Sequence, residues 1–452
     1  MRFHLNKTRF IHFLLMGFLF CSALYLSVCS PATPHFKIES AEELFGVPFS
    51  IKITGLKAGE SVTIQARSKD GWDVDWESTA TFTADKKGVV DVAKQAPASG
   101  DYIVADPLGL LWSMIPVNPK GNDPPAYEFQ KLDHIAIHLT AETASGDSLT
   151  ADIKRYFRMP GTELVRIPIE KEGLEGILFH PLQGGPHPGL ILLAGSGGGI
   201  YEWWAELMAS NGFAALTLPY FRYKDLPKEL MEIPLEYFKK AITWLKEQRA
   251  VDGNRIAVMG GSKGGELALL LAATYPEIKA VVACVPSSVV WQGISMDRFG
   301  SSWSQDGKGL PFARWHFSSE DAQKMESGQP ISLLETYSLK KNDPSVLEEA
   351  TIPVEKIKGP ILMVSGTDDQ LWPSAEFSNM VMERLEKYNH PCERQHLSYE
   401  GAGHLVFLPY FITGGNRIEM PFMNGGHPRA DANGSADFWA KMLDFLNKHL
   451  DK

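Results

Sequence analysis

The sequence predicts an α/β protein in two parts: a β-sandwich and, after it, a mostly parallel sheet flanked by helices. Residues 36–160 contain short apolar and polar alternations cut by turn residues, which is typical of an antiparallel sandwich of immunoglobulin-like plan. Residues 161–452 alternate apolar strands with helical patterns, which is typical of a parallel sheet. In this second part, Gly260-Gly261-Ser262-Lys263-Gly264 predicts a serine on a tight strand-to-helix turn.

Composition limits the classes of function. The chain has 452 residues, 44% of them hydrophobic and 22% charged, which is an ordinary globular composition for two or three domains. Its formal net charge is −10 and it has no long basic run, so nucleic acid is not expected as a partner. His134 and His138 lie on one face of a predicted strand without a third ligand nearby in sequence, so no metal or other cofactor is expected.

Residues 1–29 have the layout of an export signal, in which basic residues precede an apolar run over 10–28. Leu26-Ser27-Val28-Cys29 is similar to a bacterial lipoprotein signal, whose cysteine is lipidated after cleavage, although Val28 replaces the small residue usual there. The run is also nearly long enough for an uncleaved anchor. We therefore expect an exported protein, periplasmic or attached to a membrane by lipid on Cys29, or else held by a single N-terminal anchor.

The elements of the two parts follow from periodicity. Alternation of period two predicts the sandwich strands at residues 49–53, 62–66, 80–84, 90–92 and 135–139. In the second part, apolar runs and amphipathic spacing predict strands at 190–193, 213–216, 256–259, 280–283 and 361–364, and helices at 201–211, 234–246 and 436–449, with another helix after Ser262.

A serine, an acid and a histidine follow strands of the second part in the order that an α/β-hydrolase requires. Ser262 is the expected nucleophile, because the small residues Gly260 and Gly264 give its strained turn room. Asp369 lies in the loop after the strand at 361–364 and is preferred to Asp368 as the orienting acid. His404 follows on a glycine loop and is the expected base.

Two backbone amides are expected to form an oxyanion hole. One is the N–H of Lys263, the residue after the nucleophile, whose side chain is expected to face solvent. The other belongs to the glycine-rich loop Gly195-Ser196-Gly197-Gly198-Gly199, where Gly197 and Gly198 are equal candidates because neither has a side chain to block the approach. This loop lacks the register and the Lys-Ser/Thr pair of nucleotide-binding loops.

Between residues 290 and 353 lies a long segment rich in aromatic residues. Its position before the acid loop is one at which covering segments often occur, so its apolar side chains either line an acyl pocket or serve packing.

Several stretches along nearly the whole mature chain match one known family. They are Gly55–Thr63, Asp106–Trp112, Gly195–Gly199, Tyr223–Pro227, Gly261–Leu267, Gly366–Asp369, Gly403-His404 and Gly425–Ala430 through Trp439. In these stretches the chain resembles the type I acyl-CoA thioesterases together with the bile acid-CoA:amino acid N-acyltransferases. The resemblance includes the sandwich, which generic hydrolases lack.

The resemblance implies that Ser262, Asp369 and His404 form a catalytic triad and that the substrate is an acyl thioester of coenzyme A. It also implies that the transferase branch carries cysteine at the position of Ser262. The export leader is a departure, since it separates the chain from cytosolic coenzyme A.

Three readings therefore stay open: a thioester hydrolase, an amino acid N-acyltransferase, and an exported carboxylesterase or peptidase of the same fold. In each, the partner is a small-molecule acyl thioester or ester. A non-catalytic surface binding module remains only if the triad residues prove misaligned.

Overall fold

The computed structural model describes residues 33–117, 126–295, 297–409, 412–414, 418–419 and 421–450. The leader at 1–29, with Cys29, lies outside these residues, so export, lipidation and anchoring stay predictions. Among the helices that the structure describes, none combines the length and the apolar character needed to cross a membrane.

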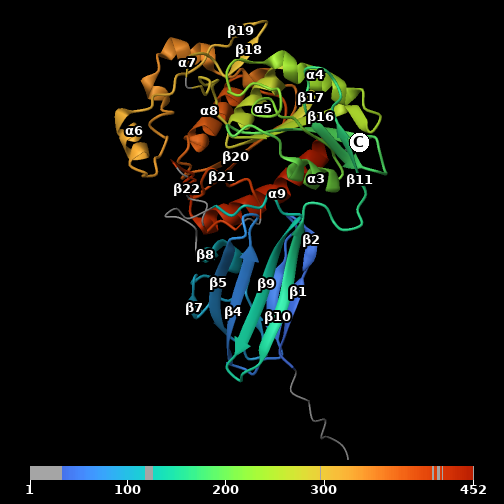
Figure 1. The fold of residues 1–452 in the computed structure, drawn as a ribbon, viewed down its shortest axis with the longest axis vertical. Helices are drawn as coiled ribbons and strands as arrows, with labels where there is room; N and C mark the ends of the chain where they lie inside the picture. Colours follow the sequence, from blue (N-terminus) through green and yellow to red (C-terminus); the bar gives the residue numbers. More distant parts are fainter. Residues whose placement is uncertain are drawn as a thin grey trace, which may run out of the picture.

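The first part is a sandwich of two sheets (Figure 1). The smaller sheet has the order β1 (His35–Glu39), β3 (Ser50–Thr54), β6 (Val90–Asp91). The larger has the order β2 (Glu42–Leu44), β10 (Ser148–Tyr156), β9 (His134–Thr143), β4 (Ser61–Lys69), β5 (Asp75–Thr83), β7 (Ser99–Gly100), with β8 (Ile115–Val117) also pairing with β5. In β4, alternate residues are buried, because successive side chains of a strand point to opposite faces.

The second part is built on one eight-stranded sheet. Its order is β11 (Leu164–Pro168), β12 (Ile177–Pro181), β14 (Ala214–Thr217), β13 (His187–Leu193), β16 (Val251–Gly261), β17 (Ile278–Cys284), β20 (Ile361–Gly366), β21 (Arg394–Tyr399). The strands from β14 to β21 are parallel, and β11 and β12 join antiparallel at one edge. This is the α/β-hydrolase fold expected from the sequence, with β16 near the centre.

Helices cover both faces of this sheet, since neighbouring residues of each central strand belong to different cores. Leu190 and Leu192 share a core with α3 (Glu202–Ser210) and α9 (Pro428–Leu450). Ile191 and Leu193 share the other with α4 (Leu235–Lys246), α5 (Lys263–Thr274) and α8 (Ser374–Lys387). Helix α9 begins at Pro428, well before the predicted start at residue 436.

The aromatic segment between β17 and β20 is folded. It contains β18 (Trp303–Gln305), β19 (Lys308–Gly309), α6 (Ser319–Glu326), η1 (Leu339–Lys341), α7 (Pro344–Ala350) and η2 (Val354–Lys356), and β18 pairs with β15 (Ile233–Pro234). Trp291 and Trp303 are fully buried, whereas Phe299 is 61% exposed. Packing therefore accounts for the two tryptophans. Later in the chain, after β21, β22 (Ile418–Glu419) and β23 (Phe422–Met423) form a small hairpin.

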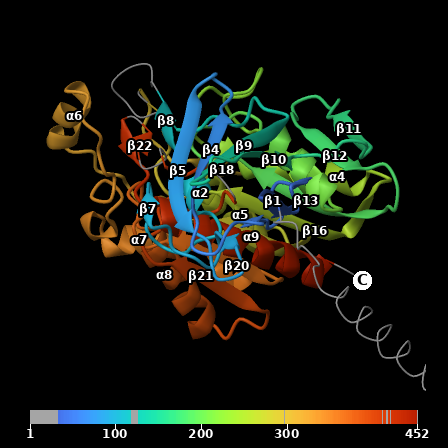
Figure 2. The same ribbon diagram turned by 90° about the horizontal axis from the view of Figure 1, so that it is seen from below.

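The sandwich and the α3/α9 layer share one apolar core. Residues of β3, β4, β5 and β9 belong to the same buried cluster as residues of α3 and α9. Figure 1 shows α9 between the eight-stranded sheet and the sandwich. The short helix α2 (Gly109–Trp112) contacts α9, and Figure 2 shows the two close together. At Gly46 the two parts approach so closely that an added Cβ would lie 2.2 Å from Nε1 of Trp439.

Replacing Gly46 by alanine should therefore destabilise the protein more than replacing Gly59. Both glycines have a left-handed φ, +95° and +75°, but a Cβ on Gly59 would meet nothing within 4 Å. We expect Gly59→Ala to lower the free energy of unfolding by about 1–2 kcal/mol through backbone strain alone, and Gly46→Ala by roughly 1–3 kcal/mol more, because the indole of Trp439 must move. Urea unfolding measures both. Equal losses would show that the Trp439 indole moves aside without a measurable cost in stability.

Candidate active site

Ser262 occupies a strained turn between β16 and α5. Its φ is 58° and its ψ is −121°, a combination that L-residues rarely adopt. The Ser262 N–H donates to the carbonyl oxygen of Cys284 at 2.9 Å, which ties the turn to the neighbouring strand β17. Ser262 is partly exposed although its surroundings in β16 and α5 are buried. The serine is thus held rigidly and can be reached from solvent.

Glycines make this turn sterically feasible. A Cβ on Gly260 would lie 2.2 Å from the carbonyl oxygen of Gly264, and one on Gly264 would lie 2.4 Å from that of Ala194. A Cβ on Gly195 would lie 3.3 Å from that of Ser262. Three backbone segments therefore meet at Ser262 with no space for side chains, as the sequence pattern predicted for Gly260 and Gly264.

The structure brings Asp369 to His404. The Nδ1–H of His404 donates to the Asp369 carboxylate, with distances of 2.8 and 3.0 Å to its two oxygens. The same carboxylate accepts from the amides of Leu371 and Trp372 and from Oγ of Ser374, at 3.0, 3.3 and 2.6 Å. Asp369 and His404 are both buried. The carboxylate is held by several donors, and so fixes the tautomer and the orientation of the imidazole.

Asp368 has another place. One of its oxygens accepts from Nε2 of Gln370 at 2.8 Å and the other from the amide of Gly426 at 3.0 Å. Asp368 therefore ties the acid loop to the segment before α9, while Asp369 faces the histidine.

The loop that carries His404 lies against the serine turn. Phe407, three residues after His404, packs so closely on Gly261 that a Cβ there would lie 2.9 Å from its ring. Ser262, Asp369 and His404 follow β16, β20 and β21, all parallel strands of one sheet. All three residues therefore come from the carboxyl edge of the sheet, where ligands bind in open α/β sheets.

The amides of Gly197 and Gly198 differ in their hydrogen bonds. The Gly198 N–H donates to the carbonyl oxygen of Gly195 at 3.1 Å, whereas the Gly197 N–H has no partner within the described part of the chain. The N–H of Lys263 opens α5, where the first amides of a helix lack intrahelical acceptors. Gly197 and Lys263 thus offer the available donors, and Gly198 does not.

The expectation that the Lys263 side chain faces solvent is wrong. Lys263 is 2% exposed and its ammonium donates to both carboxylate oxygens of the fully buried Glu266, each at 2.7 Å. Glu266 also accepts from Nε1 of Trp303 at 2.7 Å, and the Lys263 ammonium lies 5.4 Å from the centre of the Trp303 ring. Burial raises the pKa of Glu266 and lowers that of Lys263, and the attraction between the two groups offsets these shifts only in part.

This network extends to the glycine loop. Trp303 packs on Tyr220, with 5.6 Å between ring centres, and the Tyr220 hydroxyl donates to the carbonyl oxygen of Ala194 at 2.6 Å. Trp303 of the aromatic segment thus supports the first turn of α5 directly and the glycine loop through Tyr220. Glu266 carried the signal that could have revealed this, because an acid inside a helix that is apolar all round must be buried and paired.

A second serine–histidine contact is made by a serine that is fully buried. Oγ of Ser365 lies 2.6 Å from Nε2 of His396, whose Nδ1 lies 3.1 Å from Oδ1 of Asn379. Ser365 is fully buried in β20, and burial lowers the pKa of His396 to about 4. Because no substrate can reach Ser365, this trio serves the packing of β20, β21 and α8.

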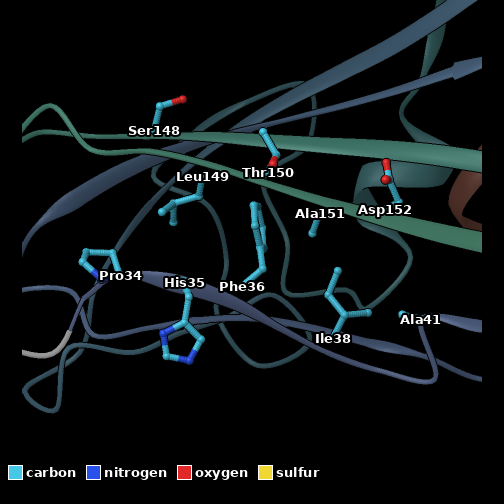
Figure 3. Close-up of a pocket in the computed structure, with 10 residues that line it drawn as sticks. All are labelled: Pro34, His35, Phe36, Ile38, Ala41, Ser148, Leu149, Thr150, Ala151 and Asp152. Atoms are coloured by element: carbon cyan, nitrogen blue, oxygen red, sulfur yellow. The ribbon is translucent and has the colours of Figure 1, made fainter.

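A cavity of about 420 Å³ lies on the sandwich, between β1 and β10 (Figure 3). Half-buried apolar side chains such as Phe36, Ile38 and Leu149 line it. Its acid, Asp152, faces Nδ1 of His138 at 2.7 Å. It is remote from the Ser262 turn, so it is separate from the candidate active site.

Both parts of the chain match models of known protein families. Residues 46–170 match the family model described as the acyl-CoA thioester hydrolase/BAAT N-terminal region, and residues 233–452 match that of the BAAT/acyl-CoA thioester hydrolase C terminal. The chain is 32% identical over 417 residues to acyl-coenzyme A amino acid N-acyltransferase 2 of Mus musculus, covering 89% of this chain and 94% of the relative. It is 30% identical over 423 residues to acyl-coenzyme A thioesterase 6 of Mus musculus, covering 89% and 93%.

The chain belongs to the acyl-CoA thioester hydrolase/BAAT family. The resemblance seen in the sequence motifs is thereby confirmed. Among solved structures, a putative dienelactone hydrolase from Klebsiella pneumoniae aligns with 64% of this chain and 100% of its own length, at 15% identity and a TM-score of 0.40.

Exchanging each aspartate for asparagine tests the roles of the two neighbours. Asp369→Asn should lower kcat/KM for a p-nitrophenyl ester by about 10³- to 10⁴-fold, because an amide in that place favours the wrong imidazole tautomer. Asp368→Asn gives up one of the two acceptor oxygens that now face Gln370 and Gly426 but leaves the Asp369–His404 contact in place, so it should lose less than about ten-fold. Equal losses would refute this division of roles, and a larger loss in Asp368→Asn would transfer the acid role to that residue.

Proposed function

We propose that the protein hydrolyses acyl-CoA thioesters through an acyl-serine intermediate on Ser262. The observation that carries the proposal is the buried Asp369–His404 pair, whose loop packs against a strained, accessible serine turn in a chain of this family. A buried imidazole with one nitrogen fixed by a carboxylate leaves its other nitrogen to serve as a base.

In the first half-reaction, Oγ of Ser262 attacks the thioester carbonyl while Nε2 of His404 takes the hydroxyl proton. The carbon–sulfur bond then breaks, and the protonated imidazole gives its proton to the departing thiolate of coenzyme A. Asp369 stabilises the imidazolium without taking its proton.

In the second half-reaction, water attacks the acyl-serine. His404 takes one proton from the water and returns it to Oγ of Ser262, and the free acid leaves. The N–H groups of Gly197 and Lys263 hold the negative oxygen that forms in each half. They are suited to this task because rigid backbone donors need no reorganisation as charge develops.

A second candidate is transfer of the acyl group to an amino acid, because one relative is named as an N-acyltransferase. The identity of the nucleophile favours hydrolysis. An acyl-serine is an oxygen ester, which discriminates less in favour of amines over water than a thioester does. With serine at position 262, water should therefore win the second step.

The product distribution tests both halves of the proposal. With an acyl-CoA and abundant glycine or taurine, the wild type should give the free acid as the main product. Ser262→Ala should lose several orders of magnitude in turnover, because triad removal leaves only binding and oxyanion stabilisation. Ser262→Cys should hydrolyse more slowly but form a larger fraction of amide. Product acids and amides are quantified by mass spectrometry.

A wild type that converts most of the acyl-CoA to an N-acyl amino acid would replace hydrolysis by transfer. Retention of more than a few per cent of activity in Ser262→Ala would remove the serine from its role. Parallel assays with simple esters and peptides, at matched acyl length, decide whether the third reading, an exported carboxylesterase or peptidase, is the better one.

We further propose that the protein acts outside the cytosol, on the basis of residues 1–29. Fractionation should recover the mature protein from an extracytoplasmic or membrane fraction, with a mass that corresponds to cleavage near Cys29. Incorporation of radioactive palmitate, absent in Cys29→Ala, would support lipidation. A cytosolic protein that retains its first residues would refute the proposal.

A further inference from the structure

Two of the family-like stretches, Asp106–Trp112 and the segment from Gly425 into α9, have no part in the catalytic steps. They are more than 300 residues apart in sequence, yet they are in direct contact, because Arg429 donates a hydrogen bond to Asp106. Asp106 is in the sandwich part and 2% exposed. One of its oxygens accepts from Nε of Arg429 and from Nδ2 of Asn433, both at 2.8 Å, and the other from the amide of Leu108 at 2.9 Å.

These contacts fix the first turns of α9 from the side of the sandwich. Arg429 and Asn433 are four residues apart, and Nδ2 of Asn433 also donates to the carbonyl oxygen of Arg429 at 3.0 Å, so both lie on one helix face. The Trp112 ring lies 6.4 Å from the ring of His427, just before the helix. A buried carboxylate that accepts three hydrogen bonds, one of them from a guanidinium, makes a stiff anchor.

The same turn of α9 holds the catalytic histidine loop on its other side. Oδ1 of Asp431, two residues after Arg429, accepts from the amide of Gly403 at 2.6 Å, and Gly403 directly precedes His404. Residues two apart point in nearly opposite directions from a helix axis. Gly426 has no room for a side chain here, since a Cβ would lie 2.5 Å from Oδ2 of Asp431.

Two further hydrogen bonds join this loop to the segment before α9. The amide of His404 donates to the carbonyl oxygen of Asn424 at 3.0 Å, and that of His427 donates to the carbonyl oxygen of Gly401 at 2.8 Å. The backbone of His404 is therefore carried by residues 424–431, and these are anchored to the sandwich by Asp106.

We propose that Asp106 of the sandwich is a positioning residue for His404, acting through Arg429 and the first turn of α9. The inference rests on the proposed role of His404 as the base. The N-terminal part then has a function in catalysis, because an unanchored α9 would let the imidazole drift from Ser262, and misplacement by about 1 Å can lower a rate by roughly 10²-fold.

The test compares Asp106→Asn with Asp70→Asn. Asp70 is an equally buried sandwich carboxylate, 2% exposed, that accepts from the amides of Trp72 and Val74 and from Nε1 of Trp76, and none of these residues is in α9. Each variant is assayed at the same interval below its own unfolding midpoint. The measurements are kcat and KM with an acyl-CoA, and the rate at which a fluorophosphonate labels Ser262.

Asp106→Asn should lower kcat and the labelling rate by roughly 10- to 100-fold and leave KM within about two-fold. Asp70→Asn should leave all three at their wild-type values. Arg429→Gln should repeat the loss, and Arg429→Lys should restore part of it, because the cation returns without the full geometry of the guanidinium.

Equal behaviour of Asp106→Asn and Asp70→Asn, or unchanged labelling in Asp106→Asn, would overturn this inference alone. The fluorophosphonate labels Ser262 whatever the leaving group of the natural substrate is, so an error in the proposed substrate does not affect the labelling measurement. A wild type whose Ser262 is not labelled would overturn the proposed nucleophile, and the inference with it.

Discussion

The close approach of three backbones at Ser262 is the constraint on which the rest of the structure depends. A Cβ on Gly260 would lie 2.2 Å from the carbonyl oxygen of Gly264, and a Cβ on Gly264 would lie 2.4 Å from that of Ala194. The end of β16, the start of α5 and the loop after β13 must therefore stay in contact. That contact places the loop that carries Gly197 beside the serine at Gly195, and in this fold such a loop and the residue after the nucleophile supply the oxyanion-hole amides. Substrate access, acid and base are all arranged around a turn that has little freedom to adjust.

Buried polar groups hold the segments around this turn in place. The Lys263–Glu266 pair lies in the first turn of α5, and Trp303 and Tyr220 connect it to Ala194. A buried ion pair stabilises a fold weakly compared with apolar packing, but removing one partner is strongly unfavourable because the other charge stays buried. Such a pair suits a place where one arrangement must be specified. The aromatic segment thus supports the active site whether or not its other side chains contact an acyl chain.

Much of this could be predicted from the sequence, because the signals were local. Small residues around Ser262, apolar strands before it and Asp369, and a glycine loop before His404 are each visible within about ten residues. The preference for Asp369 over Asp368 as the acid stays a prediction, and the contact between Asp369 and His404 agrees with it. Long-range contacts were not visible. Gly197 could be separated from Gly198 only through the turn to Gly195, and the burial of Lys263 depends on Trp303, forty residues away in sequence. The start of α9 was missed because Gly434 and the polar residues around it obscure the helical pattern.

The apolar core shared by the sandwich and the α3/α9 layer has a consequence for any attempt to divide the chain. The last sandwich strand ends at Tyr156 and the next sheet begins at Leu164, so a cut between them looks harmless along the sequence. It would nevertheless expose to water the surface of α9 around Trp439 that now packs against Gly46. The hydrolase half produced alone would carry an uncovered apolar patch of the kind that drives aggregation. The two halves are separate in topology but share one solvent-excluded interior.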